Sequence, residues 1–120
     1  MNGNGGGNRR KTGAEYEAAA AAWLETKGYR ILERNYRTRL GEIDLIAEEG
    51  DTLCFIEVKY RSSAGYGMPA EAVTPHKQQK ILAVSRHYLT VHGCWERSIR
   101  YDVVEILGGR IRVLKNSFGG

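Results

Sequence analysis

Cysteine is scarce in this sequence, and long apolar runs are absent. Cys54 and Cys94 are its two cysteines, with no C-x-x-C motif and no histidine at zinc-ligand spacing. No stretch approaches the roughly eighteen apolar residues of a membrane span. The N-terminal stretch, MNGNGGGNRRKTG, is basic but lacks the apolar segment of a secretory signal. We therefore expect a cytoplasmic protein that makes no contact with a membrane.

The composition is that of a single soluble domain. With 42% hydrophobic and 27% charged residues in a chain of 120, one hydrophobic core is expected. Residues 1–12 are rich in glycine and asparagine and include Arg9, Arg10 and Lys11. Such a segment buries too little apolar surface to fold by itself. We therefore expect a disordered basic arm at 1–12 and one domain at 13–120.

Charge is distributed unevenly along the chain. Residues 41–61 carry six acidic and two basic residues, whereas residues 1–40 and 62–120 each carry eight basic and four acidic ones. An acidic island of −4 therefore lies within a remainder of +8, giving the net charge of +4. A basic body attracts a polyanion, and an acidic island within it suits a cation. Uneven surface charge that has no function would give the same distribution. The choice between a functional and a non-functional interpretation therefore depends on the residues within the island.

The acidic island, GEIDLIAEEGDTLCFIEVKYR, has the pattern of a β-hairpin. Two alternating runs flank Gly50-Asp51, a common hairpin turn dipeptide. A two-residue turn there places Asp44 opposite Glu57, with Cβ atoms roughly 5 Å apart. Lys59 would share the face of Glu57, about 6–7 Å further along the strand.

The two facing carboxylates are better explained by function than by structure. Like charges in directly opposed positions destabilise a sheet, and a divalent cation between Asp44 and Glu57 would remove the repulsion. Such an ion lowers the pKa of water and stabilises charge that develops on a phosphate. Lys59 would orient the water or neutralise that charge. The residues therefore indicate metal-assisted phosphodiester cleavage with Mg²⁺ or Mn²⁺.

Asp44, followed by Glu57-Val58-Lys59 on the next strand, resembles the motif of the PD-(D/E)XK nuclease superfamily. More closely, the hairpin is similar to the bacterial YraN-like family, whose members are regarded as predicted endonucleases related to archaeal Holliday junction resolvases. The resemblance extends from about Gly13 to Val104. One departure is Ile43, which stands where the superfamily pattern has proline.

The resemblance implies a restriction-endonuclease-like fold and activity on DNA, branched DNA included. It implies Asp44 and Glu57 as metal ligands, with the carbonyl of Val58 as a further oxygen donor. Gly13 and Glu17 match the G-x-x-x-E pattern of resolvase-like families, whose first-helix glutamate approaches the metal; otherwise Glu17 is a solvated helix residue. Resolvase-like enzymes act as two-fold dimers, so a homodimer is also implied.

The rest of the chain predicts two helices and three further strands. Thr12 and Glu15 form a capping box for a helix that ends before Gly28, and Thr74 caps a helix that starts at Pro75 and ends near Val91. Alternating or apolar segments at 29–38, 98–107 and 110–114 indicate strands. The order predicts an α/β three-layer sandwich, with a mixed sheet of about five strands between flanking helices.

Three basic residues are candidates for binding phosphate. Lys77 lies near the start of the second helix, where the helix dipole disfavours a cation unless an anion binds beside it. Arg37 and Arg39 precede the acidic island, where they could hold phosphate or balance its charge. In the glycine-rich loop that follows the hairpin, which we expect to be mobile, Tyr66 could stack on a base or cover the core.

Two other functions fit parts of this pattern. A nucleic-acid-binding protein that retains the fold without cleaving anything would share the basic body and need no metal. A scaffold protein with an ordinary solvated hairpin would need neither metal nor nucleic acid. The intact set of Asp44, Glu57 and Lys59 favours a DNA endonuclease over both.

Overall fold

The computed structural model describes residues 11–61 and 73–119. In chain order its elements are α1 (Gly13–Thr26), β1 (Tyr29–Thr38), β2 (Gly41–Glu49), β3 (Thr52–Arg61), α2 (Pro75–His92), β4 (Ser98–Leu107) and β5 (Arg110–Leu114). The strands form a sheet in the order β1-β2-β3-β4-β5, antiparallel except for the β3–β4 pair. The predicted α/β class and mixed sheet are confirmed. Residues 1–10 of the arm predicted at 1–12 lie outside the described part of the chain, whereas Thr12 is described as the N-cap of α1.

The two helices start at the caps that the sequence predicts. The Thr12 side chain accepts a hydrogen bond from the Glu15 N–H at 3.2 Å, and Glu15 accepts one from the Thr12 N–H at 2.7 Å. The Thr74 side chain accepts from the Lys77 N–H at 3.2 Å. α2 ends at Gly93, whose φ of 61° is left-handed and therefore favours glycine.

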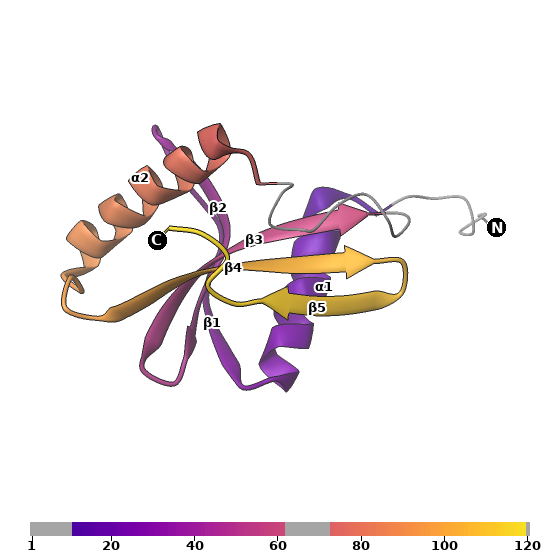
Figure 1. Cartoon of the computed structure of the whole chain (residues 1–120). Helices are drawn as coiled ribbons and strands as arrows, with labels where there is room; N and C mark the ends of the chain where they lie inside the picture. Colours follow the sequence, from indigo (N-terminus) through magenta and orange to yellow (C-terminus); the bar gives the residue numbers. More distant parts are fainter. Residues whose placement is uncertain (1–10, 62–72, 120) are drawn as a thin grey trace.

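The sheet has a separate core on each face. α2, which connects the parallel neighbours β3 and β4, lies on one face, and α1 lies on the other, giving three layers (Figure 1). The α2-side core contains Ile43, Ile46, Leu53, Phe55, Val73, Ile81, Val84, Tyr88, Leu89, Tyr101 and Val103. The α1-side core contains Ala20, Ala21, Leu24, Tyr29, Leu45, Ala47, Cys54, Ile56, Val104 and Ile106.

The hairpin register is the predicted one over most of its length. Pairing runs from Glu49 with Thr52 at the turn to Leu45 with Ile56. Gly50 in the turn has a φ of 59°, which an L side chain rarely adopts. The predicted pair further from the turn, Asp44 with Glu57, is not part of this ladder. The prediction that Asp44 and Glu57 are a directly opposed pair is therefore wrong.

The reason is that β2 loses its alternation at Asp44. Ile43 packs in the α2-side core and Leu45 in the α1-side core, although residues two apart in a regular strand share a face. Ile43, Asp44 and Leu45 are accordingly all buried. Beyond this irregularity β2 separates from β3, while it stays paired with β1 from Ile43 to Gly41.

β1 also departs from the predicted alternation. Its register against β2 shifts between Ile31 and Glu33, so the strand contains a bulge. Ile31 pairs with Ala47 of the α1-side core, whereas Glu33 pairs with Ile46 of the α2-side core. Ile31 and Glu33 therefore do not share a face, as residues two apart in a regular strand would, because the bulge adds one residue between them.

Candidate functional site

A pocket opens where β2 separates from β3, between the N-terminal turns of the two helices. Its volume is about 250 Å³. The lining residues are Gly13, Tyr16 and Glu17 from α1, Asp44 from β2, Glu57, Val58, Lys59 and Tyr60 from β3, and Lys77 from α2. The fold thus brings together six of the residues that the sequence marks as candidates: Glu17, Asp44, Glu57, Val58, Lys59 and Lys77.

Asp44 takes over a backbone role at the end of the β2–β3 ladder. Its side chain is 8% exposed, and its Oδ2 accepts a hydrogen bond from the Val58 N–H at 2.8 Å. A side-chain oxygen of β2 therefore accepts the hydrogen bond from β3 that a main-chain carbonyl would accept in a regular ladder. This bond fixes the carboxylate between the two strands, at the wall of the pocket.

Glu57 is a buried carboxylate with two cationic neighbours. Its side chain is 2% exposed, and its Oε2 lies 2.5 Å from Lys77 Nζ and 3.7 Å from Lys59 Nζ. Burial is the main cause that raises the pKa of Glu57 to about 7, and the nearby charge of Asp44 raises it further; the two lysines act in the opposite direction.

Glu17 approaches the same carboxylates from α1. Burial raises the pKa of Glu17 to about 7, assisted by the charge of Asp44 and by a hydrogen bond that protonated Glu17 shares with it. Glu42 adds to this effect, whereas Arg37 opposes it. Glu17 thus lies in the same pocket as Asp44 and Glu57, and its expected approach to a metal ion stays a prediction.

Val58 and Lys59 follow Glu57 on β3 and lie on opposite faces of the strand. The Val58 side chain packs against the α1-side core, while its N–H is held by Asp44. The Lys59 side chain is 24% exposed and points towards Glu57. Lys59, the lysine of the E-x-K triplet, therefore lies near the buried Glu57 carboxylate and also lines the open pocket.

Lys77 finds its anionic partner inside the protein. The sequence indicates that a cation at the start of α2 needs an anion beside it. In the structure this anion is the Glu57 carboxylate. Burial by itself would lower the pKa of Lys77, but the hydrogen bond and charge of Glu57 together raise it. The lysine is thus held charged beside the pocket, with 41% of its side chain exposed.

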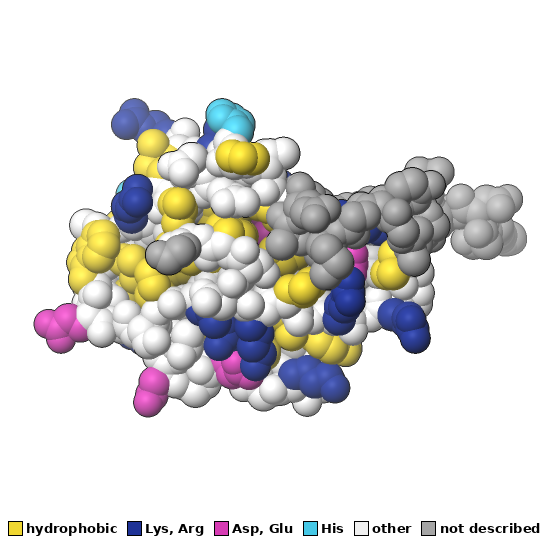
Figure 2. All heavy atoms as spheres, in the orientation of Figure 1, with side chains coloured by type: hydrophobic (Ala, Val, Ile, Leu, Met, Phe, Trp, Pro, Cys, Tyr) yellow, Lys and Arg dark blue, Asp and Glu magenta, His cyan; other side chains and the backbone are white. Residues whose placement is uncertain are grey.

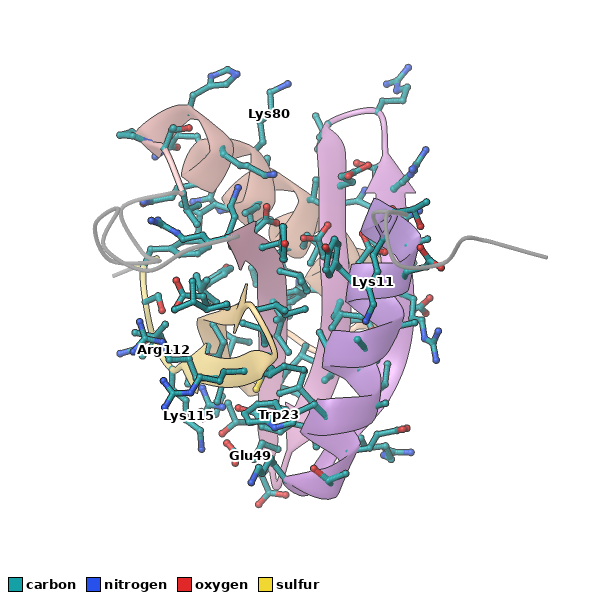
Figure 3. The ribbon with its side chains drawn as sticks, turned by 90° about the vertical axis from the view of Figure 1, so that its right-hand side faces the viewer. Lys11, Trp23, Glu49, Lys80, Arg112 and Lys115 are labelled. Atoms are coloured by element: carbon teal, nitrogen blue, oxygen red, sulfur yellow. The ribbon has the colours of Figure 1, made fainter. Side chains whose placement is uncertain are left out.

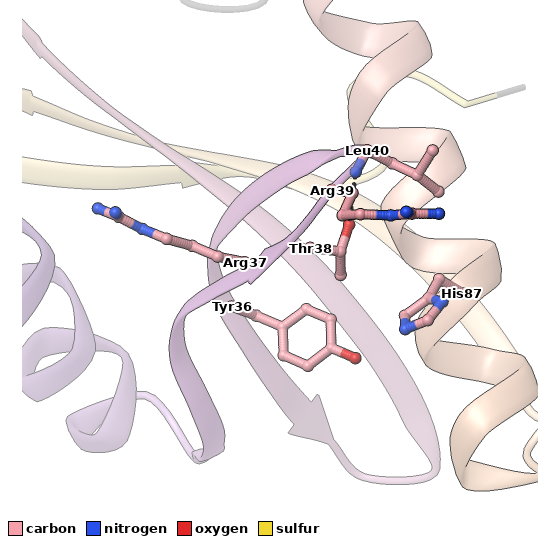
Figure 4. Close-up of a pocket in the computed structure, with 6 residues that line it drawn as sticks. All are labelled: Tyr36, Arg37, Thr38, Arg39, Leu40 and His87. Atoms are coloured by element: carbon pink, nitrogen blue, oxygen red, sulfur yellow. Dashed lines mark hydrogen bonds between the residues drawn. The ribbon is translucent and has the colours of Figure 1, made fainter.

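Arg37 and Arg39 lie outside this pocket, and their side chains point in opposite directions (Figure 4). They line a second hollow of about 380 Å³ with Tyr36, Thr38, Leu40 and His87. In Figure 4 the Arg39 side chain lies on the His87 side of this hollow, whereas Arg37 points the opposite way. Arg37 pairs with Glu42 at 3.3 Å. Arg37 therefore balances acidic charge, which is one of the two roles that the sequence allowed for it.

The basic residues of the described surface form several groups. The face shown in Figure 2 carries separate clusters of Lys and Arg side chains, and some of them lie beside acidic ones. One such group lies near the start of β4, where Arg100 contacts both Glu49 and buried Asp102, and Lys115 contacts Glu49. Part of the excess positive charge is therefore bound in structural ion pairs away from the pocket.

Sequence reasoning missed two tyrosines that line the pocket. Neither Tyr16 nor Tyr60 is among the residues that the sequence marks as candidates, yet both line the pocket. The signal for Tyr60 was available, because it directly follows the E-x-K triplet at the end of a strand. The predictions for Tyr66 and its loop, at 62–72, lie outside the described residues.

The chain has the restriction-endonuclease-like fold. It is similar to the crystal structure of Hjc from Archaeoglobus fulgidus, a Holliday junction resolvase, with a TM-score of 0.56 over 83% of this chain and 72% of Hjc. The sequence identity is 17%, so this likeness concerns the fold alone.

The chain belongs to the uncharacterised protein family UPF0102, the YraN-like family, whose pattern matches residues 16–106. Two UPF0102 relatives illustrate the match. The protein of Syntrophus aciditrophicus is 48% identical over 90% of this chain and 88% of its own length. The protein of Lachnoclostridium phytofermentans is 46% identical over 92% and 95%. Within residues 11–61 and 73–119, neither helix is long and apolar enough to cross a membrane.

The raised pKa of Glu17 predicts a pH-dependent stability. A carboxyl whose pKa rises from 4.5 to about 7 on folding stabilises the protein at low pH, and this contribution is lost as the pH rises through about 7. Glu17→Gln keeps a donor for Asp44 at every pH. Its free energy of unfolding should match the parent's near pH 5 and exceed it at pH 8, by on the order of 1 kcal/mol after screening.

Urea unfolding in EDTA between pH 5 and pH 8.5 measures this difference. Glu25→Gln, an exposed change on the same helix, is the matched control and should follow the parent at every pH. Parallel curves for the parent and Glu17→Gln would show that Glu17 holds no extra proton in the folded protein.

Proposed function

We propose that the protein is a divalent-metal-dependent endonuclease that hydrolyses DNA phosphodiester bonds, with branched DNA among its substrates. The position of Glu57 is the observation that carries the proposal. A carboxylate that is 2% exposed lines an open pocket beside Asp44, with Lys59 within 3.7 Å. Burying a carboxylate costs free energy, and a site that must bind a cation explains why the chain keeps it there.

The donor set of the pocket fits Mg²⁺ or Mn²⁺. Asp44 and Glu57 would hold the ion, with Glu17 and the Val58 carbonyl as further donors, and all of these are oxygen ligands. Within the described part of the chain, no three acidic, histidine or cysteine side chains are already arranged as a metal cluster. Mg²⁺ commonly takes one or two carboxylates and fills its other positions with water and substrate phosphate, so Asp44 and Glu57 would provide enough carboxylate ligands.

An ion held in this pocket would supply Lewis acidity, which would activate water and stabilise negative charge on the phosphate. The other contributions come from the protein. Asp44, fixed by the Val58 N–H, and Glu57 supply the negative charge that holds the cation. Lys59 orients the attacking water or neutralises the phosphate oxygens, and Lys77 contacts a neighbouring phosphate. Hydrolysis adds the water's OH to phosphorus, breaks one P–O ester bond and leaves a proton on the departing sugar oxygen.

The assembly follows from the substrate. A branched junction presents two equivalent strands, so cutting both requires two such pockets related by a two-fold axis. We therefore include a homodimer in the proposal for branched DNA. A single pocket would suffice for nicking one strand.

A non-catalytic DNA-binding protein is the second candidate, and one observation favours it. Lys77 already neutralises Glu57 through a direct ion pair, so the acidic site is partly satisfied without any metal. Such a protein would use the pocket lysines for phosphate and would cleave nothing. Incubation of branched and linear DNA with Mn²⁺ and with EDTA separates the two candidates, because only an endonuclease gives metal-dependent products.

Lys59→Met tests the catalytic assignment of the E-x-K lysine. It keeps the aliphatic stem and removes the charge, so cleavage should fall at least about a hundredfold, the usual cost of losing one charge-stabilising group. Divalent binding, measured by calorimetry, should persist or tighten, because a positive charge next to the cation is removed. Lys80→Met on α2, outside the pocket lining, is the control and should cleave as the parent does. Parent-like cleavage by Lys59→Met would contradict the assignment.

Asp44→Asn tests the metal site through stability. The asparagine oxygen can still accept the Val58 N–H, and the charge repulsion with Glu57 is removed. In EDTA the variant should therefore melt at or slightly above the temperature of the parent. In saturating Mg²⁺ or Mn²⁺ the parent should gain about 2.7 kcal/mol at a hundred times the dissociation constant, and the variant much less. The order of the two melting temperatures should thus reverse when metal is added, and a variant that melts well below the parent in EDTA would make Asp44 structural.

Lys77→Met separates ion pairing from phosphate binding. Without the ammonium beside Glu57, divalent ions should bind more tightly than to the parent. Binding to DNA should weaken for all sequences alike, and the salt dependence of log K should become shallower by about one unit. Fluorescence anisotropy across a salt series measures this slope. An unchanged slope would limit Lys77 to its ion pair with Glu57.

A further inference from the structure

Two tyrosine rings stack against each other at the edge of the carboxylate pocket. Tyr16 from α1 and Tyr60 from β3 have ring centroids 4.3 Å apart and planes inclined by 21°. Both line the pocket that contains Glu57 and Lys59. The stack therefore forms an aromatic wall immediately beside the groups to which we assign phosphate cleavage.

The hydrophobic core accounts for Tyr16 but leaves Tyr60 unexplained. Tyr16 is partly buried and packs against the α1-side core, whereas Tyr60 is 46% exposed and is not among the side chains packed there. Other large apolar side chains of the described residues are exposed as well, namely Leu40, Val91, Trp95 and Ile99, but none of them lines this pocket. Single exposed apolar residues are common, so the position of Tyr60 at the pocket is the informative feature.

A cation accompanies the aromatic wall. The Nζ of Lys11 lies 6.0 Å from the centre of the Tyr16 ring, and Figure 3 shows Lys11 against the first turns of α1, at the opposite end from Trp23. Lys59 follows Glu57 on the same strand as Tyr60. Exposed aromatic rings beside lysines are the features with which proteins bind single-stranded nucleic acid, because bases stack on the rings and phosphates contact the cations.

We propose that Tyr60, supported from behind by Tyr16, stacks on an unpaired base next to the phosphate that is cut. This inference rests on the proposed function for the position of the scissile phosphate, and it specifies the substrate class. In an intact duplex both faces of a base are covered by its neighbours, so a tyrosine has no face to stack on. The preferred substrate is therefore DNA with an unpaired nucleotide at the cut, as in a flap, a gap or a junction that carries unpaired nucleotides at its branch point.

Binding without metal tests this inference independently of cleavage. The probes are a blunt DNA duplex and the same duplex with a single-stranded tail, both followed by fluorescence anisotropy in EDTA. Tyr60→Leu should weaken binding of the tailed DNA about five- to a hundredfold, the range for the loss of one stacked base, and that of the blunt duplex little. Tyr60→Phe and Tyr60→Trp keep a ring and should bind the tailed DNA at least about as well as the parent. Trp95→Leu, at an exposed aromatic away from the pocket, should bind both probes as the parent does.

A fluorescent base reports the stacking directly. With 2-aminopurine as the first unpaired nucleotide, addition of the parent should quench the fluorescence, and Tyr60→Leu should not. Equal losses by Tyr60→Leu on tailed and blunt DNA, or no loss on either, would overturn the inference. Should Tyr60→Leu fail to fold, judged by its melting curve, the Phe and Trp variants still decide, because weaker binding by the larger Trp ring contradicts a stacking role.

Cleavage assays separate this inference from the nuclease proposal. If the parent cuts no DNA with Mn²⁺ while Tyr60→Leu loses tailed DNA selectively, the nuclease proposal fails and the stacking site stands as a binding site. If the parent cuts blunt and tailed DNA equally well and Tyr60→Leu does the same, the stacking inference fails and the nuclease proposal stands.

Discussion

The loss of alternation in β2 at Asp44 is the feature on which the rest of the site depends. Because Ile43 and Leu45 pack in opposite cores, Asp44 lies between the two faces of the sheet. Its carboxylate takes the Val58 N–H that a regular ladder would give to a main-chain carbonyl. β2 can then separate from β3 without leaving the partly buried Val58 N–H unpaired. The pocket lies in the gap between the two strands. A regular hairpin would have closed this space and placed two carboxylates in direct opposition.

The pocket is held close to neutrality by its own lysines. Isolated buried charges are costly, and Glu57 is tolerated because Lys77 and Lys59 approach its Oε2. The remaining cost appears as carboxyl groups with pKa values of about 7 at Glu17 and Glu57. The burial that causes these pKa shifts also strengthens electrostatic interactions inside the pocket. A cation that replaced the proton on these carboxyl groups would therefore be bound more strongly than at an exposed site.

Features with short-range signals could be predicted from the sequence, and features that depend on distant contacts could not. The capping box at Thr12 and Glu15 and the turn at Gly50 are determined by neighbouring residues, so the starts of the helices and the hairpin register were predictable. The loss of alternation at Asp44 accompanies the packing of Ile43 and Leu45 in opposite cores. The alternation pattern of a single strand does not reveal this packing. The pairing of Lys77 with Glu57 and the stacking of Tyr16 on Tyr60 join residues on different elements. Only the assembled sheet brings them together.

Under the proposed function, the charge balance of the pocket would link the binding of metal to the binding of DNA. With every group ionised, three carboxylates (Glu17, Asp44 and Glu57) oppose two lysines (Lys59 and Lys77), which leaves one negative charge. A divalent ion would turn this into one positive charge, and a single phosphodiester would then restore neutrality. The first turns of α1 and α2 both contribute residues to this pocket, and the partial positive charge of a helix N-terminus favours a phosphate over a second cation. Each of the two ligands therefore lowers the electrostatic cost of binding the other, and the two should bind cooperatively as a pair.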